Sequence, residues 1–88
     1  MNEEQALEIV YGDYDESLYT LIVDSKDDGH VTHDITAYHS IVQRLSDHTY
    51  WKIRYMLSYD EGLDEDDIFH YEVEPVEVMT TEWKRKGV

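Results

Sequence analysis

The regular alternation of side chains over residues 49–59 is the feature that most constrains the fold. One set of alternate positions is Trp51, Ile53, Tyr55, Leu57 and Tyr59, and the other is Tyr50, Lys52, Arg54, Met56 and Ser58. Successive side chains of a strand point to opposite faces, so this segment predicts a strand with one apolar face. Because an isolated strand leaves its backbone groups unpaired, the chain is expected to build a sheet around it.

A second pattern, at helical spacing, follows Asp34. Its apolar positions are Ile35, Tyr38, Ile41, Val42 and Leu45. Residues three, four and seven apart lie on one side of a helix. We therefore predict one main amphipathic helix over residues 34–46, with Asp34 as its N-cap, packed on one face of the sheet.

A shorter helix is predicted near the N-terminus. Asn2 followed by Gln5 three residues later is the capping-box pattern, and Gly12 suits the position just after a helix. The apolar residues of this stretch also alternate, as in a strand. A strand over residues 3–11 is therefore the alternative.

The remaining segments predict further strands. Residues 18–23 are rich in β-branched and aromatic side chains, residues 25–29 are typical of a turn, and residues 30–32 are expected to return as a second strand. Residues 71–83 form the last strand region, and the alternation there slips at Pro75, which favours a bulge or an edge position.

The length of 88 residues allows a single domain with a small core. No cysteine is present, so disulfides and thiolate sites are excluded. The N-terminus lacks the apolar run of a signal peptide, and no segment approaches the ~20 apolar residues of a membrane span. We predict one acidic cytoplasmic α+β domain over residues 1–88, with a small antiparallel sheet of three to five strands and the helix at 34–46 on one face.

Charge is the most unusual property of the composition. Twenty-one acids against seven bases give a net charge of −14, which repels nucleic acid and anionic membranes and attracts basic partners. The acids occur in clusters, of which the densest lies within residues 60–67. The candidate partner-binding residues are Asp60, Glu61, Asp64, Glu65, Asp66 and Asp67, then Asp13, Asp15 and Glu16, and then Glu72, Glu74 and Glu77.

Clustered carboxylates suggest a mimic of DNA. Proteins gain affinity for DNA when phosphates replace the counterions of their basic groove, and fixed carboxylates can occupy the same groove. In size and acidity the chain resembles, as a class, the small phage and mobile-element inhibitors of restriction enzymes, CRISPR effectors or uracil-DNA glycosylase. The hypothesis is an inhibitory module whose partner is a basic nucleic-acid-binding or nuclease protein, with no direct contact to nucleic acid or membrane.

Two other interpretations of the charge stay open. The first is a small acidic structural or adaptor subunit, or a homodimer, that associates through an apolar sheet face. The second is a solvated acidic surface of the kind that keeps halophile proteins soluble in salt. Charge reversal separates the first from a mimic, because apolar association tolerates it. A halophile protein should instead lose its fold in low salt.

Catalytic, metal and cofactor sites have no support among the motifs, so we predict none. The chain has no P-loop, dinucleotide fingerprint or nucleophile elbow. The segment from Asp24 to Gly29 begins like an EF-hand calcium loop, because it has acids at the first and fifth positions and glycine at the sixth. However, Lys26 and Ile35 stand where such a loop needs an acid and a bidentate Glu.

Overall fold

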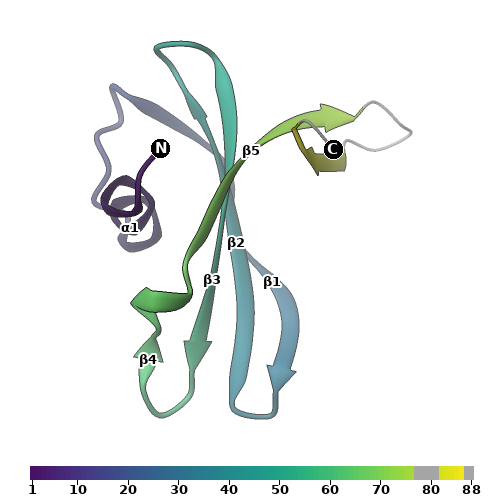
Figure 1. Ribbon diagram of the computed structural model, residues 1–88. Helices are drawn as coiled ribbons and strands as arrows, with labels where there is room; N and C mark the ends of the chain where they lie inside the picture. The colour runs from purple at the N-terminus through teal and green to yellow at the C-terminus, as the bar shows by residue number, and fades with distance from the viewer. Residues whose placement is uncertain (77–81, 87–88) are drawn as a thin grey trace.

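The computed structural model describes residues 1–76 and 82–86, and this part of the chain is mostly strand. Its elements in chain order are α1 (Glu3–Tyr11), β1 (Tyr19–Thr32), β2 (Ile35–Arg44), β3 (Thr49–Ser58), β4 (Gly62–Leu63), the 3-10 turn η1 (Glu65–Asp67), β5 (Phe69–Val76) and β6 (Glu82–Arg85). The sheet is antiparallel in the order β1-β2-β3-β5-β6, and β4 pairs with the end of β3. Figure 1 shows the sheet curling into an open half-barrel with α1 beside one face.

The main helix predicted over residues 34–46 is wrong, because this segment forms the central strand β2. The strand pairs with β1 on one side and with β3 along its whole length on the other. Ala37 and Ile41 are buried on one of its faces. Ser40 and Val42 are buried on the other. A strand covered on both faces loses its polar alternation, so its apolar residues fell at a spacing that also fits a helix.

The turn predicted at residues 25–29 is also wrong, as is the return strand at residues 30–32. β1 runs through both segments, and its pairing with β2 contains four register shifts. Ser25 (φ 44°) and Gly29 (φ 97°) adopt the left-handed conformation inside the strand. These turn-forming residues therefore lie at irregularities that bend and twist β1, and the chain reverses later, at residues 33–34.

The helix predicted near the N-terminus is confirmed as α1, in place of the alternative strand. Asn2 Oδ1 accepts the backbone N–H of Gln5 at 2.8 Å, and Gln5 Oε1 accepts the N–H of Asn2 at 3.1 Å. Gly12 (φ 76°) ends the helix and donates its N–H to the carbonyl of Ile9. These bonds satisfy backbone groups that have no partner inside the helix.

We expect Asn2→Ala to lower the free energy of unfolding by about 1 kcal/mol, because alanine offers no acceptor to the first turn. Asn2→Asp keeps the acceptor and places a negative charge at the helix N-terminus, so it should cost much less. Urea denaturation measures both variants. Equal losses would contradict the capping role of the Asn2 side chain.

The strand predicted over residues 49–59 is confirmed as β3, which lies between β2 and β5. Ile53 and Tyr55 are buried and Trp51 is half-buried, whereas Tyr59 is 90% exposed just beyond the strand. The core cluster beneath α1 consists of Ala6, Ile9, Tyr19, Val42 and Ile53. This core fixes α1 against one face of the sheet.

The last strand region, predicted over residues 71–83, is divided between β5 and β6. Pro75 pairs with Trp83 of β6 and lies beyond Val73, the last residue of β5 that pairs with β3. Its missing N–H therefore removes no bond from the central ladder. Residues 77–81 lie outside the described part of the chain. Within that part, no helix is long and apolar enough to cross a membrane.

Candidate functional site

Two acidic segments that contain no Lys or Arg lie on the side of the sheet covered by α1. Residues 1–18 and 59–68 each contain six Asp or Glu, and together they hold twelve of the 21 acids. The twelve are Glu3, Glu4, Glu8, Asp13, Asp15, Glu16, Asp60, Glu61, Asp64, Glu65, Asp66 and Asp67. We call these two segments the anionic side.

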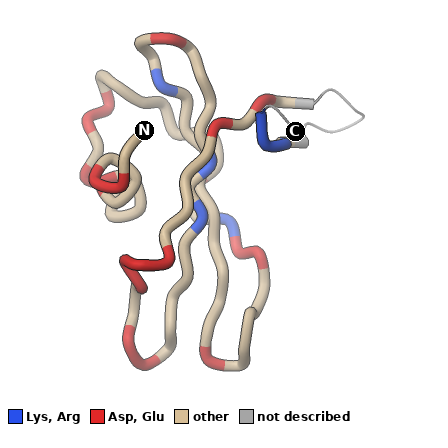
Figure 2. Tube along the Cα trace, in the orientation of Figure 1, with Lys and Arg blue, Asp and Glu red and all other residues tan. Residues whose placement is uncertain are grey.

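Direct contacts join the two segments. The hydroxyl of Tyr11 donates to Glu65 Oε1 at 2.7 Å, although the two residues are 54 positions apart. Tyr14 and Ile68, one from each segment, pack against the same core cluster as α1. In Figure 2 the acidic parts of α1, of the loop after it and of η1 all lie on this side of the sheet. The fold therefore assembles one acidic surface from distant parts of the chain.

Local hydrogen bonds order several of these carboxylates. Asp64 accepts the backbone N–H of Asp66 at 3.0 Å and so caps η1. Asp15 accepts both the hydroxyl (2.7 Å) and the N–H (2.9 Å) of Ser17, and these bonds hold the pKa of Asp15 below its usual value. The negative charge of Asp64 raises the pKa of Asp67 above its usual value. The acids of η1 therefore repel one another, and a cationic partner would relieve that repulsion.

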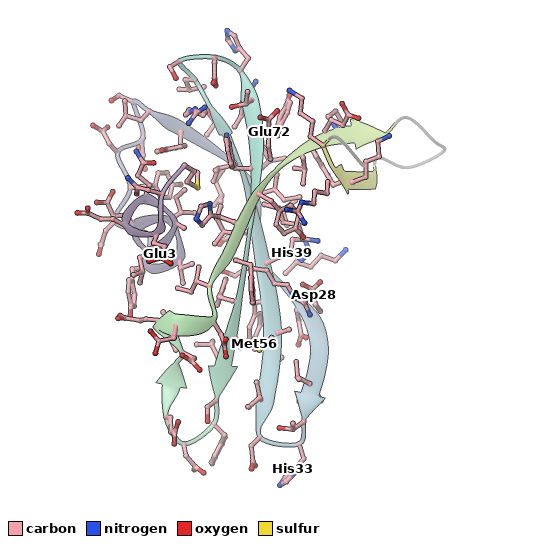
Figure 3. All side chains as sticks on the ribbon, viewed as in Figure 1. Glu3, Asp28, His33, His39, Met56 and Glu72 are labelled. Carbon is pink, nitrogen blue, oxygen red and sulfur yellow. The ribbon has the colours of Figure 1, made fainter. Side chains whose placement is uncertain are left out.

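A groove of about 380 Å³ opens beside η1. Its apolar lining is Ile35, Met56 and Leu63, and its carboxylates are Glu61, Asp64, Glu65 and Asp67. Figure 3 labels Met56 on β3, close to η1. Lys and Arg side chains combine an aliphatic stem with a cationic head, so the groove matches the chemistry of both.

Comparisons with protein-family models, curated proteins and solved structures give no match. The function must therefore be inferred from the site itself. Among the described residues, no three His, Asp or Glu side chains gather into a group that could hold a metal ion.

The described acids of the predicted cluster at residues 72–77 point to the sheet face that α1 covers, but both are paired with lysines. Glu72 forms an ion pair with Lys86, and Glu74 lies 3.5 Å from the amine of Lys84. Glu77 lies outside the described residues. The C-terminal lysines therefore neutralise two of the supporting candidates, whereas Asp13, Asp15 and Glu16 lie in the loop after α1, within the anionic side.

The acids of α1 were missed by the sequence reasoning. Glu3, Glu4 and Glu8 belong to the anionic side because α1 packs over β3 and β5, near η1. The capping box placed these residues on a helix. Their position beside residues 60–67 depends on a tertiary contact that leaves no local signal.

The bases occupy other parts of the fold. The seven are Lys26, Arg44, Lys52, Arg54, Lys84, Arg85 and Lys86. They belong to β1, β2, β3, β6 and the residue after β6. Figure 2 shows them along the sheet and near the C-terminus, and one of them, Arg44, lines a pocket with Gln5 of α1 and Ser17. The two acidic segments therefore contain no base of their own, and Arg44, which lies beside them, is paired with Asp47.

We expect Glu65→Gln to lower the pKa of the Tyr11 phenol toward its usual value. The hydrogen bond to Glu65 raises this pKa because it stabilises the neutral phenol, and the carboxylate charge further disfavours the phenolate. An NMR titration of protein labelled at tyrosine Cζ measures the shift. Glu61→Gln removes the same charge without this contact and should leave the Tyr11 titration unchanged. Equal effects of the two variants would contradict the contact.

Proposed function

We propose that this protein is an inhibitory binding module that mimics DNA and presents its anionic side to the basic groove of a nucleic-acid-processing protein. The observation that carries the proposal is the presence of twelve acids, and no Lys or Arg, on two segments that meet beside α1. Fixed carboxylates release the counterions of a basic groove as phosphates do. The partner is then a basic nucleic-acid-binding or nuclease protein. Nucleic acid itself is repelled by the net charge of −14.

The groove beside η1 supports a specific mode of contact. Charge alone attracts many basic proteins to an acidic surface, but it does not specify where or in which orientation a partner binds. The lining of Ile35, Met56 and Leu63 offers apolar surface to the stem of a partner's Lys or Arg, while Glu61 and Asp64 lie close to its cationic head. Such a contact adds burial of apolar surface to the electrostatic attraction.

The biological setting follows from the same proposal. The inhibitors that work in this way belong to the phage-type anti-restriction, anti-CRISPR and DNA-repair inhibitor class. A protein of this class acts in the cytoplasm of the host cell, where its target works. It acts by occupying the groove of the target, so it needs no catalytic residue and no cofactor.

An adaptor or homodimer is the second candidate function, and one observation favours it. Leu18, Ile22 and Val31 are between 42% and 53% exposed in or next to β1, which is an edge strand of the sheet. Exposed apolar residues along a strand edge are a common site of association. Association there would depend on apolar contacts and would resist salt.

A pull-down from host lysate at rising salt, with and without competitor DNA, tests the proposal. A mimic should capture a DNA-binding or DNA-cleaving protein, and both salt and DNA should release that partner. Capture of a partner that neither salt nor DNA releases would contradict the DNA-mimic proposal. If the tagged protein captures only further copies of the same chain, the result would favour the homodimer.

A further inference from the structure

The sheet face that points away from α1 carries cations and aromatic rings. Ile53 belongs to the core under α1, so its neighbours Lys52 and Arg54 on β3 point to the opposite face. Residues paired across an antiparallel ladder share a face. This pairing adds Tyr71 opposite Lys52 and Phe69 opposite Arg54.

A third cation joins this face from β6. Arg85 pairs with Val73, and its guanidinium carbon lies 5.3 Å from the centre of the Tyr71 ring. The rings of Tyr50 and Trp83 lie 5.1 Å apart on the same face. We call Lys52, Arg54, Arg85, Phe69 and Tyr71 the cationic face.

These cations have no acidic partner among the described residues. Lys52, Arg54 and Arg85 form no ion pair there, whereas Arg44 and two C-terminal lysines do. The acids of β5 alternate with Phe69 and Tyr71, so they point to the other face of the sheet. In a chain with 21 acids and seven bases, three cations have gathered on one face, and Asp28, the carboxylate there, is bonded to His39 and to none of the three. Their mutual repulsion favours the binding of an anion.

The cationic face also contains a pocket of about 280 Å³. It is lined by Arg54, Phe69, His70, Tyr71 and Arg85. Phe69 is 52% exposed, so its ring is free to stack on a ligand. Guanidinium groups bind phosphate through paired hydrogen bonds, and exposed aromatic rings stack on nucleobases. We propose that the cationic face binds a free nucleoside phosphate, with Arg54 and Arg85 at the phosphate and Phe69 at the base.

The size and surroundings of the pocket favour a single nucleotide over a nucleic-acid strand. Pockets for small ligands begin at about 300 Å³, close to the volume here. Charges are screened over about 8 Å at physiological salt, and the molecule is 20 Å across at its thinnest. The arginines therefore attract a small dianion at short range. Further phosphates of a strand would extend over a protein of net charge −14 and would be repelled.

Isothermal titration calorimetry with AMP, inorganic phosphate and adenosine tests this site. We expect AMP to bind about tenfold more tightly than either fragment, because it engages the arginines and the ring together. Arg54→Gln and Phe69→Ala should each weaken AMP binding by about tenfold. Lys84→Gln is the matched control: it removes the same charge from a side chain that pairs with Glu74. It should leave AMP binding unchanged.

Three results would overturn the proposal. Equal affinity for AMP and inorganic phosphate would indicate simple attraction of anions. Absence of AMP binding at concentrations up to about 5 mM would show that this face is not a nucleotide-binding site. Tighter binding of a single-stranded oligonucleotide than of AMP would assign the face to a strand instead. Each result can be separated from the proposed function, because Lys52, Arg54, Arg85, Phe69 and Tyr71 are not part of the anionic side.

Discussion

The double reversal Asp66→Lys/Asp67→Lys is expected to lower the affinity for the captured partner by about 100-fold or more. Close charge pairs across an interface contribute about 1.5 kcal/mol or more each, and 1.4 kcal/mol is a factor of ten. Both side chains are exposed, so the fold should survive. Asp64, which caps η1, and Glu65, which binds Tyr11, are left in place. Calorimetry with the identified partner measures the change.

A control variant with the same change in net charge separates the effect of where the charges lie from the effect of net charge. Thr20→Lys/Ile22→Lys/Asp24→Lys adds two cations and reverses one acid on the exposed part of β1. Like the η1 variant, it moves the net charge by four, from −14 to −10. It should weaken binding less than tenfold and preserve the salt dependence. The η1 variant should reduce the slope of log affinity against log salt by about two. Equal losses in both would show that binding follows net charge alone.

Elements with a local cause were predictable from the sequence. Asn2 and Gln5 define the start of α1 through bonds within one turn, and β3 alternates because its two faces meet different environments. β2 was mistaken for a helix because burial on both faces removed its alternation. β1 was divided in two because Ser25 and Gly29, which favour turns, lie at irregularities of a long strand. The sequence contains no sign of which strand lies at the centre or where a bulge replaces a turn.

The candidate site was predictable as a set of acids and not as a surface. Residues 60–67 are dense enough to stand out in any fold. Glu72 and Glu74 were expected to support them, but the lysines of the C-terminal segment neutralise both. Glu8 and its neighbours on α1 were overlooked, and the Tyr11–Glu65 bond brings their helix to η1. Which acids share a surface depends on pairings between distant segments, and composition cannot specify these.

The largest expected effect on stability comes from Ile53→Ala, which should lower the free energy of unfolding by about 2–5 kcal/mol. Ile53 is fully buried between α1 and the sheet, so the change removes apolar contacts and leaves a cavity. A small domain is stable by about 5–15 kcal/mol, so this variant approaches the limit of folding. Each kcal/mol moves the Tm of a chain of this size by about 4–8 °C, so calorimetry should show a fall of at least about 8 °C.

Ile22→Ala is the matched control, because it makes the same change at a side chain that is 42% exposed on β1. Both substitutions carry the same loss of β-propensity, so the difference between them reports burial. We expect the control to cost less than about 1 kcal/mol. Equal losses would mean that α1 does not close the core over Ile53. α1 contains three of the twelve acids of the anionic side and contacts η1 through the Tyr11–Glu65 bond. The Ile53→Ala protein should therefore also bind its partner less tightly than the Ile22→Ala protein, although every carboxylate is still present.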